Sequence, residues 1–278
     1  MNKKPLVIVT PVYLEEITEN ELLSIQSIKQ HLNQYDRAII SPRKFESNPK
    51  FITQWEEYGY KVVFFDNQHF SSIEKHNKFL MSQLLYETFA EYDYMLMAQL
   101  DVLIFSNSIG YWMDKKLDYV GSSWIINEGK NKKLVGNGGN GGLSLRNIQT
   151  FLKVIDSKKF YSKRDLFNIL PAYSKVRNIL FVGLLIQLKP LQSFAHLLKR
   201  FFAGKEDMFW SYYAPFFVED YHLASLEDTV AFAFERYPEF CFEENQQKLP
   251  FGTHAWEKYN IEFWEKHQED TITEEKLG

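Results

Sequence analysis

One carboxylate follows an apolar run in a setting that suits metal binding. Residues 94–101 read YMLMAQLD, so Asp101 comes directly after a segment that we expect to be a buried strand. A carboxylate at the end of such a strand can hold a divalent cation, which in turn neutralises a diphosphate. An Asp in this position also caps or turns the chain in many proteins, so the segment alone leaves both interpretations open.

A second segment, residues 136–142, is GNGGNGG. Glycines at this density permit positive φ angles and close approach of the backbone to a ligand, or amides directed at an anion. The segment lacks the Lys-Ser/Thr ending of a phosphate-binding P-loop and does not follow the first strand, which disfavours an ATPase or a dinucleotide-binding protein. A surface turn is the alternative interpretation.

Two further segments contain ionisable side chains beside large aromatic residues. Glu206 and Asp207 stand at an expected helix start, where they either cap the helix or supply a general base. His254 lies between Pro250-Phe251-Gly252 and Trp256 in an expected loop. It is either structural or completes a site with Asp101.

The elements that must position these residues follow an alternating pattern. We expect strands at four short apolar runs and a further strand at 118–122, with helical spacing of apolar residues between the runs (strands: Leu6–Val9, Ala38–Ile40, Val62–Phe65 and Tyr94–Met97; helices: Leu22, Ile25, Ile28 and Leu32, then Ile73, Leu80 and Leu84). Alternating strands and helices imply parallel pairing through right-handed crossovers. Ligands bind beyond the carboxyl ends of such strands, here Thr10–Tyr13 and Gln99–Asp101.

The composition narrows the function classes. With 32 Lys and Arg against 36 Asp and Glu, the chain has a net charge of −4, which disfavours nucleic acid as a partner. The lone Cys241 excludes an internal disulfide and a cysteine-based zinc site, and fits a reducing cytoplasm. The aromatic content of 17% suits contact with carbohydrate. No apolar run is long enough for a signal peptide or a transmembrane helix.

A basic segment interrupts the second half of the chain. Residues 150–205 contain eleven Lys or Arg and two Asp. Residues 177–202 can form amphipathic helices, which either lie on an anionic membrane surface or pack as ordinary helices with solvated lysines.

Taken in order, the motifs resemble those of a GT-A-type glycosyltransferase. They are most similar to a bacterial family first catalogued as a domain of unknown function and tied to surface-polysaccharide synthesis. The similarity covers about residues 5–265 and is carried by an ordered series of segments (70–73, Asn77-Lys78, 94–101, 118–121 with Trp124, 136–139, 143–146, 206–210 and 250–256).

The resemblance implies a role for each of these residues. The donor side would comprise Thr10, Pro11, Tyr13, Asn77, Gln99 and Asp101. Asp101 and His254 would bind Mn²⁺ or Mg²⁺. The acceptor side would comprise Trp124, Gly138, Gly139, Gly141, Gly142 and Trp210. Asp207 would be the base of an inverting displacement, with Glu206 beside the acceptor. In this chain Gln99 replaces the first acid of the usual D-x-D element, and the glycine segment has an additional Asn140-Gly141-Gly142.

From this resemblance we expect an α/β fold: a single GT-A-like domain with a mixed, mainly parallel central sheet flanked by helices. Residues 1–105 would form the nucleotide-binding half and residues 106–270 the acceptor half, including a basic helical insert at 156–204. The activity expected is cytoplasmic transfer of a sugar from a nucleotide-sugar, with UDP as the expected nucleotide. The expected acceptor is a surface glycan or lipid-linked glycan, reached through contact of residues 158–203 with the anionic inner face of the membrane.

Two other functions remain open at this stage. A non-catalytic nucleotide-sugar or glycan-binding protein could use the same fold, given Gln99 in place of an acid. A nucleotidyltransferase is less favoured, because Pro11–Glu15 lacks the glycine-rich basic loop that such enzymes have after the first strand.

Overall fold

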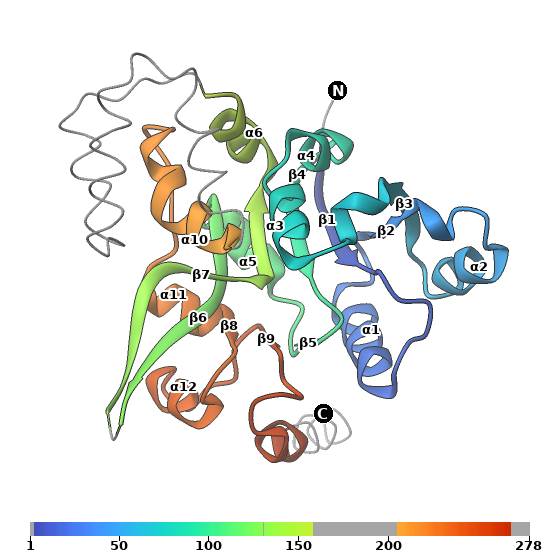
Figure 1. Ribbon diagram of the computed structural model, residues 1–278. Coiled ribbons are helices and arrows are strands. Elements are labelled where there is room, and N and C mark those ends of the chain that lie inside the picture. Colours follow the sequence, from blue (N-terminus) through green and yellow to red (C-terminus); the bar gives the residue numbers. More distant parts are fainter. Residues whose placement is uncertain (1–2, 130, 158–204, 268–278) are drawn as a thin grey trace.

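The computed structural model describes residues 3–129, 131–157 and 205–267. Its centre is a six-stranded sheet with the order β3-β2-β1-β4-β7-β6, flanked by helices (Figure 1). The elements in chain order are β1 (Lys4–Pro11), α1 (Glu19–Leu32), β2 (Asp36–Pro42), η1 (Arg43–Phe45), α2 (Pro49–Glu57), β3 (Lys61–Phe65), η2 (Asn67–Phe70), α3 (Ile73–Leu80), α4 (Gln83–Thr88), β4 (Tyr92–Ala98), β5 (Val102–Ile104), α5 (Ile109–Asp114), β6 (Tyr119–Glu128), β7 (Asn131–Asn147), α6 (Ile148–Asp156), α10 (Glu206–Met208), η3 (Phe209–Tyr213), η4 (Ala214–Phe216), α11 (Leu226–Phe232), β8 (Ala233–Phe234), α12 (Pro238–Glu244) and β9 (Gly252–His254).

The four expected strands pair in parallel as β1 to β4. Alternate residues of β1 enter two different cores, because successive side chains of a strand point to opposite faces. Val7 and Val9 join the core that contains Phe151 of α6, while Leu6 and Ile8 join the one that contains α1. A sheet buried on both faces explains the uninterrupted apolar runs. The expected α/β class with a mixed, mainly parallel sheet is confirmed.

The other two strands of the sheet run antiparallel. β7 pairs with β4, and β6 pairs with β7 through register shifts near Ser122. The β6–β7 hairpin extends away from the rest of the sheet (Figure 1). The glycine segment is not a surface turn but belongs to β7, a strand of 17 residues. The expected strand at 118–122 is the start of the longer β6.

A smaller sheet with the order β5-β9-β8 lies beside the carboxyl end of β4. β5 begins at Val102, directly after Asp101, and pairs with β9 so that Val102 is opposite His254. Residues that are more than 150 positions apart in the sequence are therefore brought together by one strand pair.

The helical spacing was only partly correct. α1 buries Ile25, Ile28 and Leu32 as expected and begins with a capping box formed by Thr18 and Glu21. The second expected helix is two short helices, α3 and α4.

In those two helices Ile73 is 80% exposed and Leu84 50% exposed, while Phe79, Leu80, Leu85 and Tyr86 are buried. The break between the helices changes which face meets the sheet, so a single period across 73–84 does not apply. None of the helices within the described ranges has the length and apolar character of a membrane span. The expected basic insert lies, except for its first two residues, outside the described residues.

Candidate functional site

The carboxyl ends of β1 and β4 are neighbours, because Val9 is paired with Met97. The chain leaves β4 through Gln99, Leu100 and Asp101, and the backbone N–H of Gln99 donates to the carbonyl of Gly142 in β7 (2.9 Å). This bond ties the turn after β4 to the glycine segment, and it places the side chains of Gln99 and Asp101 above the sheet edge.

His254 faces this turn. Its Nε2 lies 3.2 Å from Oε1 of Gln99 and 3.4 Å from Oδ1 of Asp101. Its Nδ1 lies 3.9 Å from a carboxylate oxygen of Glu235, beyond hydrogen-bond distance. The other oxygen of Asp101, Oδ2, accepts a hydrogen bond from the ammonium of Lys258 (2.6 Å). Asp101 is thus held between an imidazole and a lysine.

This arrangement fits a divalent cation only in part. Oδ1 of Asp101 and Nδ1 of His254 are buried without a hydrogen-bond partner. Two ligands of one Mg²⁺ ion lie about 3 Å apart when each is about 2.1 Å from the metal. The 3.4 Å between Asp101 Oδ1 and His254 Nε2 is close to that value. Across the described residues, however, no cluster of three His, Cys, Asp or Glu could hold a metal. Asp101 and His254 could supply two ligands of a cation, and its remaining ligands would have to come from outside the protein.

Two glycines of β7 permit this packing. A Cβ at Gly142 would lie 2.1 Å from Nε2 of His254, and a Cβ at Gly141 would lie 2.2 Å from Oε1 of Glu206. These positions have to lack a side chain for His254 and Glu206 to approach the strand. Asn140 supports the bend, since its Oδ1 accepts the backbone N–H of Gly142 (2.8 Å).

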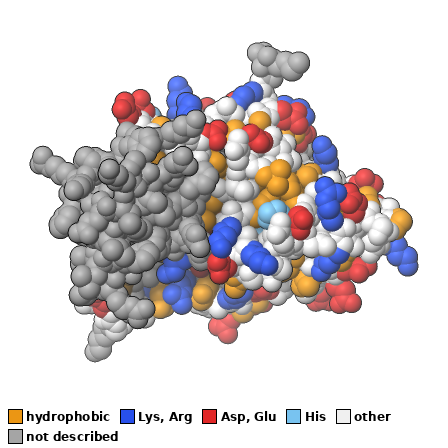
Figure 2. Space-filling model, turned by 45° about the horizontal axis from the view of Figure 1, so that its top comes forward, with side chains coloured by type: hydrophobic (Ala, Val, Ile, Leu, Met, Phe, Trp, Pro, Cys, Tyr) orange, Lys and Arg blue, Asp and Glu red, His pale blue; other side chains and the backbone are white. Residues whose placement is uncertain are grey.

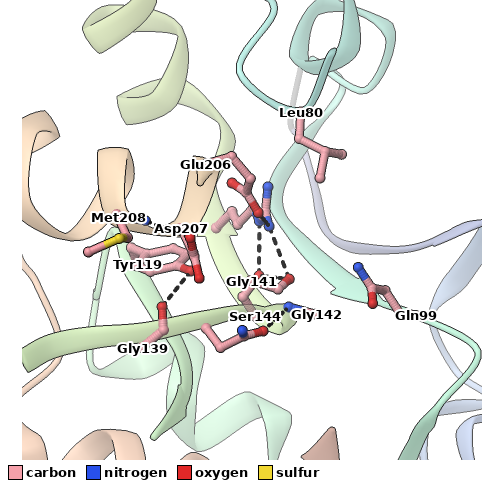
Figure 3. A network of polar contacts seen from close by, with 12 residues as sticks. Leu80, Gln99, Tyr119, Gly139, Gly141, Gly142, Ser144, Glu206, Asp207 and Met208 are labelled. Atoms are coloured by element: carbon pink, nitrogen blue, oxygen red, sulfur yellow. Dashed lines mark hydrogen bonds and ion pairs between the residues drawn. The ribbon is translucent and has the colours of Figure 1, made fainter. Parts of the chain in front are cut away.

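Glu206 is the buried partner of Arg146. Figure 3 shows Glu206 above Gly141 of the glycine strand. Arg146 of β7 is fully buried and donates to Ser144 Oγ, Tyr86 Oη, the Gly141 carbonyl and Glu206 Oε1 at 2.8–3.1 Å. Burial raises the pKa of Glu206 above its ordinary range, against the opposing pull of Arg146. This pair fixes α10 to the glycine strand.

Asp207 follows in the same turn of α10, and its Oδ1 accepts the backbone N–H of Met208 (2.8 Å). Burial raises the pKa of Asp207, and the hydrogen bond from Met208 opposes that rise. A carboxylate with a raised pKa is a stronger base than an exposed aspartate, so Asp207 is suited to accept a proton.

One cleft of about 1330 Å³ is lined by Asp101, His254, Glu206 and Asp207. Of the residues proposed from the sequence, the cleft is lined by Pro11, Tyr13, Asn77, Gln99, Asp101, Trp124, Gly141, Gly142, Glu206, Asp207 and His254. In Figure 2, apolar side chains and a histidine gather on one face, with lysine and arginine side chains close by. Trp124 stacks on Tyr212, with ring centroids 5.7 Å apart and planes inclined by 7°, which gives the cleft an aromatic wall.

Four expected site residues lie elsewhere among the described residues. Trp210 is fully buried and stacks on Phe151 in the core, with ring centroids 3.7 Å apart, so it presents no surface to an acceptor. Thr10 is also fully buried and does not line the cleft.

The remaining two are glycines. Gly138 and Gly139 have φ angles of +91° and pack against Ser211 and against the carbonyls of Gly121 and Ser122. Their glycine character therefore serves the irregular β6–β7 pairing, and they do not line the cleft.

The sequence reasoning missed Lys258, Glu235 and Arg146 as members of this site. Lys258 lies four residues after His254, and this proximity is the one signal that could have indicated it. Glu235 is the first residue after β8, and only the β8–β9 pairing brings it to His254. Arg146 was noted in a motif without a role, because nothing in the sequence marks it as buried.

The model of one protein family, described as "Protein of unknown function (DUF5672)", matches residues 59–254. This chain belongs to the DUF5672 family. The DUF5672 match includes Asp101, Asp207 and Arg146 and ends at His254. It agrees with the resemblance to a family catalogued as a domain of unknown function. No curated protein has a significant sequence match to the chain.

Several solved structures align with parts of the DUF5672 chain at low TM-scores. A glycosyltransferase involved in glycosylation of the major capsid of PBCV-1 aligns with a TM-score of 0.40 and 9% identity over 90% of this chain and 92% of that chain. The mannosyltransferase Ktr4p from S. cerevisiae, solved with GDP, aligns with a TM-score of 0.32 and 12% identity over 46% of this chain. The alignment spans less than half of the yeast protein, 42%.

The 4-diphosphocytidyl-2C-methyl-D-erythritol synthase from Anaerococcus prevotii aligns with a TM-score of 0.34 and 9% identity over 66% of this chain and 96% of that chain. At this level of similarity, these structures do not assign an activity to the DUF5672 chain.

Proposed function

We propose that this protein is a glycosyltransferase that moves a sugar from a nucleotide-sugar, with UDP as the expected nucleotide, to a glycan acceptor. The observation that supports the proposal is the meeting of Asp101, Asp207 and His254 in one cleft. They come from three distant parts of the chain and have different chemical properties: a possible cation ligand, a carboxylate with a raised pKa, and an imidazole.

The size and chemistry of the cleft suit two substrates. Pockets for one drug-sized ligand have volumes of about 300–1000 Å³, and this cleft is larger, at about 1330 Å³. The donor would occupy the side of Pro11, Tyr13 and Asp101. The acceptor would lie against the Trp124–Tyr212 wall, because sugar rings stack on aromatic faces.

Acidic side chains outnumber basic ones along the cleft, seven to three (acidic: Glu16, Glu21, Asp101, Glu206, Asp207, Glu235 and Glu257; basic: Lys205, Arg236 and Lys258). An anionic diphosphate therefore needs additional positive charge there. Asp101 and His254, with the amide oxygen of Gln99 nearby, would hold Mn²⁺ or Mg²⁺ together with the diphosphate. Such a cation, when bound, stabilises the negative charge of the leaving diphosphate.

In the proposed reaction Asp207 takes the proton of an acceptor hydroxyl. The freed oxygen forms a bond to the anomeric carbon from the face opposite the diphosphate. The bond between the anomeric carbon and the diphosphate oxygen breaks, and its electron pair leaves with the nucleoside diphosphate. The configuration at the anomeric carbon inverts. Glu206 orients α10 through Arg146 and borders the acceptor side.

The test is turnover of a panel of UDP- and GDP-sugars, with and without EDTA. Asp207→Asn keeps the shape of the side chain and removes its basicity, so we expect a loss of about 10²–10⁴-fold in turnover with unchanged UDP binding. Asp114→Asn, an exposed acid of α5 away from the cleft, is the matched control. Undiminished turnover of Asp207→Asn would remove the base assignment. Binding of donor by the wild type without turnover of any acceptor would favour the non-catalytic alternative.

The setting of the reaction is also a proposal. A surface glycan or lipid-linked glycan as acceptor, in the cytoplasm at the inner face of the membrane, follows from the basic segment of the sequence. Co-sedimentation with anionic vesicles at low and high salt tests it, and absence of binding at low salt would refute it.

A further inference from the structure

Lys258 is placed where an incoming cation and an incoming diphosphate would both meet it. Its ammonium donates to Oδ2 of Asp101 at 2.6 Å, while Oδ1 of the same carboxylate faces His254. The lysine thus occupies one side of the group that would bind the cation. Two positive charges on one carboxylate repel each other strongly when the surroundings are partly buried, and the Asp101 side chain is only 15% exposed.

The backbone around Lys258 is fixed, while its side chain has room to move. Trp256 is buried, Glu257 accepts a hydrogen bond from Asn20 at the start of α1, and the N–H of Lys258 donates to the carbonyl of Ala255. The side chain of Lys258 is 58% exposed and lines the cleft. A long flexible side chain on an anchored backbone can exchange one anionic partner for another nearby.

We infer that Lys258 is a diphosphate-binding residue that exchanges partners: it neutralises Asp101 in the ligand-free protein and moves to the nucleoside diphosphate when Asp101 takes up the cation. This inference rests on the proposed function. It explains how the mostly buried carboxylate of Asp101 keeps a partner of opposite charge before the substrate binds. It also implies that free cation binds weakly until a diphosphate draws the lysine away.

If Lys258 has both roles, its removal should weaken the binding of UDP and strengthen the binding of Mn²⁺. Lys258→Met removes the ammonium and keeps an unbranched side chain. We expect UDP binding in the presence of saturating Mn²⁺, when Asp101 holds the cation, to weaken about 10- to 100-fold, as for the loss of a hydrogen bond to a charged group. We expect Mn²⁺ alone to bind about fivefold or more tightly, because the competing charge is gone. A lysine that only pairs with Asp101 would also tighten metal binding when it is removed, but its removal would leave UDP binding unchanged.

The measurements are calorimetry of UDP and GDP at saturating Mn²⁺, and titration of Mn²⁺ without nucleotide, each on the full chain. Lys258→Arg should restore UDP binding and again weaken Mn²⁺. Lys248→Met, an exposed lysine outside the cleft, should match the wild type in both. Unfolding curves show whether each variant is folded.

The outcomes separate the inference from the proposed function. If the wild type binds UDP or GDP and Lys258→Met binds them equally well, or if its Mn²⁺ affinity is unchanged, the inference is wrong and the proposed function stands. If the wild type binds neither nucleotide, the proposed function fails and the inference falls with it.

Discussion

Replacing Arg146 by Met tests whether one buried ion pair holds the acidic turn against the glycine strand. The guanidinium is fully buried and donates four hydrogen bonds, and its partner Glu206 has a side chain that is 5% exposed. In the variant Glu206 remains buried without its counter-charge, and its Oε2 already has no hydrogen-bond partner. Removing one member of a buried pair costs about 3–5 kcal/mol, because the other charge is left uncompensated.

The stability lost in Arg146→Met should be larger at neutral pH than in acid. Burial already raises the pKa of Glu206 above its reference value of 4.5, and Arg146 opposes this rise. Without Arg146 the pKa of Glu206 rises further in the folded state. A carboxyl whose folded pKa is raised binds more protons folded than unfolded, so the variant loses stability as pH rises from about 4.5 through the folded pKa. The destabilisation should therefore be smallest in acid and largest at neutral pH.

Urea unfolding of the wild type, Arg146→Met, Glu206→Gln and Arg146→Met/Glu206→Gln at a series of pH values measures these effects. The double variant has no buried charge at this place, so its stability should vary less with pH, and its loss of stability should be smaller than the sum of the two single losses by about 1–3 kcal/mol. Arg43→Met is the matched control, since Arg43 pairs with Glu46 on the surface at 2.9 Å with 57% of its side chain exposed. That change should stay within about 0.5 kcal/mol. A loss below about 1 kcal/mol for Arg146→Met at neutral pH, or one independent of pH, would refute the reasoning.

Three further changes address the cleft. Gly142→Ala places a Cβ 2.1 Å from Nε2 of His254, so His254 must move. The affinity for Mn²⁺ together with UDP, measured by calorimetry, should fall at least about tenfold. An unchanged affinity would mean that His254 is not part of the donor site. The pKa of Asp207 is raised from 3.8. In a plot of turnover against pH, the acid limb should therefore lie at higher pH than for an ordinary aspartate, and Asp207→Asn should abolish that limb. A limb retained in the variant would point to another base. Trp124→Ala removes one ring of the stack with Tyr212. It should raise the KM for the acceptor about five- to tenfold without altering the affinity for UDP. An equal loss of UDP affinity would place the aromatic wall on the donor side.

Local patterns sufficed for the four parallel strands, because burial on both faces leaves an uninterrupted apolar run in the sequence. They also indicated Asp101, since a polar residue at a strand end lies where ligands bind in such sheets. They did not indicate Lys258 or Glu235, which join the site only through the pairing of β9 with β5 and β8. Pairing between segments so far apart depends on how the whole chain packs, and no short-range periodicity records it.

The sequence also did not show which of two tryptophans, Trp124 or Trp210, lines the cleft. Trp124 and Trp210 are both aromatic residues near motif positions, yet one lines the cleft and the other is fully buried against Phe151. What separates them is the neighbouring structure: Trp124 lies on the β6–β7 hairpin that extends from the sheet, whereas Trp210 follows α10 into the core.

The adjacent acids Glu206 and Asp207 show the same effect within one helical turn. Successive residues of a helix point about 100° apart, so two neighbouring carboxylates enter different surroundings. Oε1 of Glu206 accepts a hydrogen bond from the buried guanidinium of Arg146, whereas among the described residues Oδ1 of Asp207 accepts the backbone N–H of Met208. A proton acceptor must not be neutralised by a permanent cation, and this favours Asp207 over Glu206 as the base. The sequence could locate an acidic pair, but only the position of a third residue, Arg146, sixty positions before Glu206 in the chain, shows that its two members have different surroundings.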